Sequence, residues 1–280
     1  MNLNGKRILL TGAAGGIGQP LALALSSKGA KLALVDRDQV AISTMCEKIN
    51  QIGGLGGTGG IAMPIVTDFQ ETETDLYPAK SVVSQAVEHL GGVDILINSA
   101  GILDFTMFEA QNMARISQMM HINATVPMLL TRALLPRFFA QNSGHIVNIG
   151  SIFGSIGFPH FATYSASKFA IHGFSQALRR ELVGSNIAVT YIAPRAVKTP
   201  MNDQAALMLA ATKTAMDDPE VVVAKIIKAI EAEKHEYYIG QPESFFAWLN
   251  GFLPSLVDIG LKKQAEIASR FLSRKNNPAK

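Results

Sequence analysis

Short apolar runs alternate with longer segments of helical periodicity along most of the chain. The runs are mostly continuous in Val, Ile and Leu, without polar alternation, which is typical of strands buried on both faces of a parallel sheet. The seven predicted strands are RILLT (7–11), KLALV (31–35), IAMPIV (61–66), VDILIN (93–98), HIVNI (145–149), IAVTYIA (187–193) and EYYIG (236–240). The six predicted helices lie at about residues 17–28, 38–50, 72–90, 109–140, 162–183 and 218–233.

This alternation indicates right-handed βαβ units, and therefore a Rossmann-like α/β fold with one doubly wound, parallel seven-stranded sheet and helices on both faces. We expect this domain to span residues 1–241 and a C-terminal helical extension to span 242–280. One low-complexity run, GGLGGTGG at 53–60, precedes a strand and not a helix. It therefore lacks the helix N-terminus of a phosphate-binding loop and favours a flexible surface connection.

A glycine-rich turn, TGAAGGIG, joins the first predicted strand to the first predicted helix. Glycine allows the backbone to turn sharply and to approach a pyrophosphate closely, and the helix N-terminus then offers free amides and a partial positive charge. The spacing G-x-x-x-G-x-G differs from the G-x-G-x-x-G fingerprint, so a plain strand-to-helix turn is the alternative. The residues expected to border a dinucleotide here are Gly12, Ala14, Gly16, Ile17 and Gly18.

Two acidic residues follow the next two predicted strands. Asp36 ends the second strand, where a carboxylate accepts hydrogen bonds from ribose hydroxyls and repels a 2′-phosphate, which favours NAD(H). The neighbouring Arg37 could instead accommodate that phosphate, so NADP(H) remains possible. Asp68 ends the third strand, where it either bonds an adenine amino group or caps the following helix.

Tyr164 and Lys168 lie four residues apart and so share one face of a predicted helix. A free tyrosine has a pKa of ~10, too high for a base at neutral pH. A nearby ammonium together with an oxidised nicotinamide ring would favour the phenolate and lower that pKa. Ser151 follows the strand HIVNI, at the sheet edge where such folds bind ligands, and could hold a substrate oxygen. The alternative is that Tyr164 and Lys168 lie on an exposed helix face and have no catalytic role.

With these motifs on about residues 5–240, the chain resembles the short-chain dehydrogenase/reductase family, in the branch that carries TGxxxGxG and YxxxK. The resemblance implies that Ser151, Tyr164 and Lys168 are catalytic, and that Asn123 holds a water that links Lys168 to solvent. On the sequence alone Asn123 would be a helix-kink residue. The resemblance further implies these neighbours of the cofactor: Asn98, Ala100, Gly101, Tyr164, Lys168, Pro194 and Thr199.

Two positions depart from the family pattern. Ser99 replaces the second Asn of the usual Asn-Asn-Ala-Gly, which keeps hydrogen-bonding capacity. Arg195 replaces the Gly that usually follows Pro194, and it would be strained if that backbone required a positive φ. Arg195 either points into the substrate cleft or packs on the surface, and we favour the surface.

Apolar residues dominate the segments expected to flank a substrate, IFGSIGFPHF at 152–161 and MNDQAALMLAATKTAM at 201–216. They form either a lipophilic pocket or an ordinary packing surface. In the tail, residues 245–257 follow an i, i+3, i+4, i+7 apolar spacing, as an amphipathic helix requires. This tail is either a lid or subunit contact or an interfacial membrane helix with a basic flank, and we favour the first.

The 280 residues carry a net charge of +3, with six Lys or Arg and one Glu between 262 and 280, a local +5. The basic character therefore belongs to the tail and gives no support to nucleic-acid binding. The single cysteine, Cys46, excludes an intramolecular disulfide, and a strand pattern that begins at Arg7 leaves no room for a signal peptide. We expect a cytoplasmic protein, with possible peripheral membrane contact, that forms a homodimer or homotetramer and has no metal site.

These observations predict an enzyme that exchanges hydride between a nicotinamide cofactor and an alcohol or carbonyl group of a small, lipophilic substrate. Two alternatives remain. One is a 3-oxoacyl thioester reductase, and the other is a catalytically silent dinucleotide sensor or scaffold.

Overall fold

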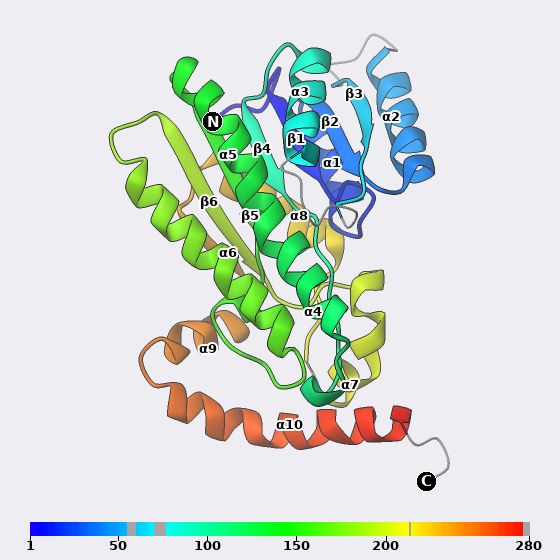
Figure 1. The fold of residues 1–280 in the computed structure, drawn as a ribbon, viewed down its shortest axis with the longest axis vertical. Helices are drawn as coiled ribbons and strands as arrows, with labels where there is room; N and C mark the ends of the chain where they lie inside the picture. The colour runs from blue at the N-terminus through cyan, green and yellow to red at the C-terminus, as the bar shows by residue number, and fades with distance from the viewer. Residues whose placement is uncertain (55–59, 70–76, 213, 277–280) are drawn as a thin grey trace.

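The computed structural model describes residues 1–54, 60–69, 77–212 and 214–276, so most of the GGLGGTGG run lies outside the described residues. Seven parallel strands form one sheet in the order β3-β2-β1-β4-β5-β6-β7 (Figure 1). This confirms the predicted doubly wound α/β fold. The strands are β1 (Arg7–Thr11), β2 (Lys31–Asp36), β3 (Ala62–Val66), β4 (Ile95–Asn98), β5 (Gly144–Ile149), β6 (Ile187–Pro194) and β7 (Glu236–Ile239).

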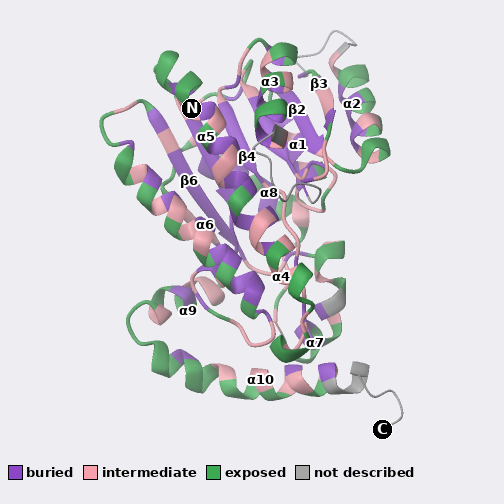
Figure 2. Ribbon diagram, viewed as in Figure 1, coloured by how far each residue is buried: buried purple, intermediate pink, exposed green. Residues whose placement is uncertain are grey.

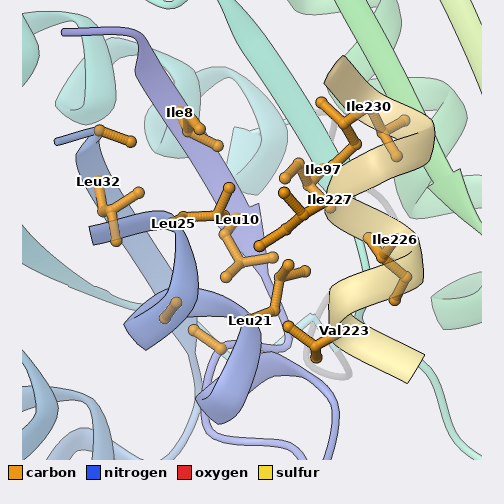
Figure 3. Close-up of a cluster of buried hydrophobic side chains, with 14 of the residues drawn as sticks. Ile8, Leu10, Leu21, Leu25, Leu32, Ile97, Val223, Ile226, Ile227 and Ile230 are labelled. Atoms are coloured by element: carbon orange, nitrogen blue, oxygen red, sulfur yellow. The ribbon is translucent and has the colours of Figure 1, made fainter. Parts of the chain in front are cut away.

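Helices cover both faces of the sheet because successive strand residues point to opposite sides. Ile8 and Leu10 of β1 pack against α1 and α8 (Figure 3). Leu9 between them packs in the opposite layer with α3 and α5. Both layers are apolar, so the strands have no polar alternation. The helices are α1 (Gly18–Ser27), α2 (Gln39–Gly54), α3 (Tyr77–Leu90), α4 (Met113–Met120), α5 (Val126–Ala140), α6 (Ala162–Glu181), α7 (Ala206–Ala211), α8 (Pro219–Glu231), α9 (Glu243–Asn250) and α10 (Pro254–Asn276).

The prediction of one continuous helix over 109–140 is wrong, because the structure has two α-helices with short turns before and between them. A short 3-10 turn (Phe108–Ala110) comes first, and the Asn112 side chain then caps α4 by accepting a hydrogen bond from the Ala114 amide. A π-helical turn, His121–Thr125, separates α4 from α5. Caps and π-turns interrupt the backbone ladder without interrupting the apolar spacing, so the sequence pattern reads as one helix.

The extension beyond β7 forms α9 and α10, which lie at one end of the molecule, where α10 runs beside α7 (Figure 1). Residues 251–253 separate the two helices, so the predicted amphipathic stretch over 245–257 is not one helix. Ala247 and Val257 pack against Ile152 and Ile156. Within the described residues, no helix has the length and apolarity that a membrane crossing needs.

Candidate active site

A cleft of about 410 Å³ lies at the carboxyl ends of the parallel strands. The chain leaves β1 toward β2 on one side, whereas β4 pairs with β1 on the other, so this edge contains the switch point where doubly wound sheets bind ligands. Most of the residues predicted for cofactor and catalysis line the cleft. They are Gly12, Ala14, Gly16, Ile17, Gly18, Asp36, Arg37, Asp68, Ala100, Gly101, Ser151, Tyr164, Lys168, Pro194 and Thr199.

The glycine turn has the close backbone approaches that a dinucleotide cradle needs. Gly12 has a φ of +69°, and a Cβ on it would lie 2.7 Å from the Ala100 backbone. A Cβ on Gly16 would lie 2.5 Å from the Thr199 side chain, so the loop after β6 packs directly on the turn. Among the described residues no side chain caps the start of α1. The Gln19 and Leu21 amides donate to the Gly15 and Ile17 carbonyls and Pro20 has no N–H, so in the described first turn the Gly18 amide is the one left to face an anion. The residues present therefore fit a dinucleotide.

Asp36 is held at the rim of this cradle by backbone amides. Its carboxylate accepts hydrogen bonds from the Ala14 amide at 3.0 Å and the Asp38 amide at 3.2 Å. These contacts fix the negative charge of Asp36 between the glycine turn and Arg37. Asp36 lines the cleft, as do Ala14, Arg37 and Asp38.

Ser151, Tyr164 and Lys168 converge at the other end of the cleft. Ser151 directly follows Gly150 at the end of β5, and its hydroxyl accepts a hydrogen bond from the Phe153 amide, which caps a 3-10 turn (Ile152–Gly154). Tyr164 and Lys168 are buried on α6, and Lys168 Nζ lies 5.7 Å from the centre of the tyrosine ring. Lys168 Nζ also donates to the Ile149 carbonyl at 3.2 Å.

Burial opposes charge on both α6 side chains. It raises the pKa of Tyr164 to about 12, against a weaker opposing effect of a hydrogen bond with Ser151. It also lowers the pKa of Lys168 to about 8. The free protein therefore keeps Tyr164 protonated at neutral pH. A lowered tyrosine pKa would need the further positive charge of an oxidised nicotinamide.

Two predicted residues lie beneath the cleft and do not line it. Asn98 is buried and donates to Asn148 Oδ1 at 2.8 Å. Asn123 sits in the π-helical turn, where its amide exchanges hydrogen bonds of 2.8 and 2.9 Å with the Ile102 backbone and donates to Ser167 Oγ at 2.9 Å. It therefore ties the loop after β4 to α6, and its proton-relay role stays a prediction.

A polar cluster behind Ser151 was not predicted. The Tyr191 hydroxyl donates to the Ser151 carbonyl at 3.0 Å and accepts from the Ser151 amide at 3.4 Å. The Tyr191 ring stacks on His172, with centroids 4.3 Å apart, and His172 pairs with Glu236 at 3.3 Å. The hydrogen bond with His172, together with those from Gln176 and Arg179, lowers the pKa of Glu236 to about 2. The sequence offered two signals for this cluster. Tyr191 is a polar aromatic residue in an otherwise aliphatic strand, and His172 lies one helical turn after Lys168.

Arg195 is neither strained nor on the open surface. It is absent from the described residues that have a positive φ outside glycine, which are Asn142, His160 and Glu233. Its guanidinium makes a two-point pair with Asp217 (2.7 and 3.0 Å) and also contacts Glu243 at 3.0 Å. Only 14% of the side chain is exposed. The preferred expectation of surface packing is therefore wrong, because Arg195 joins the rim of the cleft to the C-terminal extension.

Apolar side chains form the wall beside Tyr164. Phe153 stacks on Phe158 with centroids 5.1 Å apart, and it meets the Tyr164 ring edge-on at 6.2 Å. Phe153, Phe161 and Leu209 line the cleft. Both flanking segments that the sequence singled out thus contribute to this wall.

A sequence model of the short chain dehydrogenase family matches residues 6–209. The chain is 32% identical over 239 residues to the ketoacyl reductase HetN of Nostoc sp., covering 85% of this chain and 80% of that protein. It is 30% identical over 274 residues to the dehydrogenase/reductase SDR family protein 7-like of Anopheles gambiae, covering 95% and 84%. It is 34% identical over 203 residues to the putative oxidoreductase SadH of Mycobacterium tuberculosis, covering 71% and 69%.

The doubly wound sheet and the matched relatives place the chain in a class of oxidoreductases, a family that generally binds NAD(P)(H). The chain belongs to the short-chain dehydrogenase/reductase family. Within the described residues, no group of three or more His, Cys, Asp or Glu side chains is arranged to hold a metal ion.

Proposed function

We propose that this protein catalyses reversible oxidoreduction of an alcohol or carbonyl group on a small, lipophilic substrate, with a nicotinamide cofactor. The observation that carries this proposal is the convergence of Ser151, Tyr164 and Lys168 in the same cleft as the glycine turn. The apolar wall of Phe153, Phe161 and Leu209 beside Tyr164 supports a lipophilic substrate.

Each residue has a distinct part in this proposal. When bound, the nicotinamide would give or take the hydride. Tyr164, held protonated by burial, donates its proton to the substrate oxygen during reduction and must accept one during oxidation. The Ser151 hydroxyl holds that oxygen, and Lys168 supplies positive charge beside the phenol. Asn123, bonded to the loop after β4 and to α6, would relay protons toward Lys168.

The cofactor we propose is NAD(H), because the Asp36 carboxylate lies at the rim of the cradle and would repel a 2′-phosphate. NADP(H) is the alternative, since Arg37 also lines the cleft. An Asp36→Ser variant should narrow or reverse the preference for NAD(H), measured as the ratio of kcat/KM values for the two cofactors. A wild-type preference for NADP(H) would show that this assignment of Asp36 is wrong.

A 3-oxoacyl thioester reductase is the second candidate, because the relative from Nostoc sp. is named a ketoacyl reductase. The deciding experiment is a panel of alcohols, aldehydes, ketones and 3-oxoacyl thioesters, run with both cofactors. Tyr164→Phe is the control, since it removes the proton donor and keeps the ring. Its turnover should fall on the order of 10²-fold or more, with NADH affinity within a few-fold. A protein that binds NAD(H) but turns over no member of the panel would instead be the silent sensor.

The remaining assignments are a cytoplasmic location and a homodimer or homotetramer. The single Cys46, which is buried, supports a reducing compartment. The position of residues 242–276 at one end of the molecule supports a domain of 1–241 with an appended extension. Sedimentation velocity on the full chain would measure the mass of the assembly, and a monomer would contradict the oligomer.

A further inference from the structure

The extension exposes a group of large apolar side chains, which we call the aromatic patch. Trp248 is 60% exposed, Phe252 68% and Ile259 72%. The ring centroids of Trp248 and Phe252 are 5.1 Å apart, and Phe245 lies 5.8 Å from Trp248, so the rings form one cluster. The members of the patch are Phe245, Phe246, Trp248, Phe252, Leu253, Leu256 and Ile259.

The patch is not the face that attaches the extension to the protein. Ala247 and Val257 make that attachment, and the Asn250 amide donates to the Ser155 carbonyl at 3.0 Å. Trp248 and Phe252, which lie between them in the sequence, are exposed, and exposed residues also run along much of α10 (Figure 2). A lid role for the inner face and a docking role for the outer face are therefore compatible.

Basic residues follow the patch on the same helix. Leu256, Ile259 and Lys263 share one face of α10 by their i, i+3, i+7 spacing, and all three are exposed. The whole stretch from 262 to 280 contains six Lys or Arg and one Glu. An apolar surface rich in Trp and Phe, continued by cationic residues, matches the interface of a bilayer that contains anionic lipids.

A second copy of this chain fits the same surface less well. Two patches that met through a twofold axis would bring two basic stretches into one assembly. The exposed acids of α10, Asp258 and Glu266, are too few to neutralise them. We propose that the outer face of α9 and the first half of α10 is a docking surface for an anionic membrane. Membrane docking through this face would not require the proposed reaction.

The chain carries its own reporter, because Trp248 is the only tryptophan. The full-length protein is mixed with vesicles of phosphatidylcholine alone or of phosphatidylcholine with phosphatidylglycerol. Only the anionic vesicles should sediment the protein, and they should shift the Trp248 emission to the blue and protect it from a water-soluble quencher. Binding should weaken as salt rises from roughly 0.05 M to roughly 0.5 M, because exposed charges are screened.

Paired variants distinguish binding through the aromatic patch from nonspecific adsorption of the protein to vesicles. Phe252→Asp with Leu256→Asp keeps the reporter and should lower the partition coefficient by about 10-fold or more. The matched control is Phe139→Asp with Val183→Asp, which alters two exposed apolar residues far from the extension in the sequence and should leave partitioning unchanged.

The basic residues are tested in the same way. Lys262→Glu with Lys263→Glu should weaken binding to the anionic vesicles, whereas the control, Lys48→Glu with Lys228→Glu, should not. All eight positions are exposed, so each variant should melt within a few degrees of the wild type.

Three results would overturn the proposal. They are no sedimentation with anionic vesicles at low salt, an equal loss in the control variants, and a blue shift that appears with protein concentration alone. If the blue shift appeared with protein concentration alone, and if Phe252→Asp with Leu256→Asp halved the mass of the assembly, the patch would be a subunit contact.

Discussion

Lys168 is a cation whose surroundings work against its charge. It is buried beside Tyr164, and burial lowers its pKa from 10.5 to about 8. A lysine whose pKa is lower in the folded state binds fewer protons there than in the unfolded chain between these two values. The contribution of Lys168 to the free energy of unfolding should therefore rise with pH across this window, and it is lost as pH falls through 8.

This linkage gives a test on the free protein. Between pH 8 and 10, Lys168 should add roughly 2 kcal/mol to the free energy of unfolding. A Lys168→Met variant should lack this rise, so the free energy of unfolding of the wild type should increase by roughly 2 kcal/mol relative to that of the variant between pH 8 and 10. Urea unfolding at a series of pH values measures it. Parallel curves for the two proteins would mean that Lys168 keeps its ordinary pKa.

Tyr191 bonds the backbone of Ser151, the serine that we propose to be catalytic, without reaching the cleft, since it is buried and absent from the cleft lining. A Tyr191→Phe variant removes both hydrogen bonds to the Ser151 backbone. We expect kcat to fall about 10-fold, because small displacements of a reacting group are costly, with cofactor affinity unchanged. Tyr238→Phe is the control, since that hydroxyl bonds the Ser155 hydroxyl at 2.8 Å and not Ser151. Equal losses in both variants would argue for a general packing effect.

The strands and most helices could be predicted from the sequence because they depend on local apolar spacing. Every predicted strand is present within a residue or two, and α6 begins at Ala162 as expected. For Asn123 the sequence indicated a helix kink but not a π-helical turn, and the contact of Tyr191 with Ser151 could not be predicted. The π-helical turn changes the hydrogen-bond ladder and not the pattern, and the contact joins residues 40 positions apart in the sequence.

Arg195 shows how one side chain connects separate elements. It joins the end of β6 to Asp217 before α8 and to Glu243 at the start of α9. An Arg195→Met variant leaves both carboxylates without this partner, so the free energy of unfolding should fall by about 1–3 kcal/mol. Lys198→Met breaks the exposed pair with Asp218 and should have no measurable effect. Thermal melts of both variants test this, and equal shifts would contradict a special role for Arg195.

In the whole molecule the cofactor cradle lies at one end of the cleft, and the described part of the C-terminal extension packs behind the other end, which contains Tyr164, without lining the cleft itself. Gly12 and Asp36 lie on the side of β1 and β2, whereas the extension packs against the loop after Ser151 and against α7. Residues 242–280 should therefore influence the substrate more than the cofactor. Their inner face buries Ala268 and Leu272 in the same cluster as Leu103, Phe161 and Tyr164.

A chain that ends at Gln241 tests this division. Removing the extension exposes Ile152, Ile156, Met208 and Leu209, which it now helps to cover. Stability should fall by several kcal/mol, since each large apolar side chain contributes roughly 1.5–3 kcal/mol when buried. NADH affinity should stay within a few-fold, and KM for long apolar substrates should rise more than KM for short ones. Fluorescence titration of NADH and a substrate-length series measure the two effects. If cofactor affinity fell while KM stayed constant, the extension would belong to the cofactor half of the cleft.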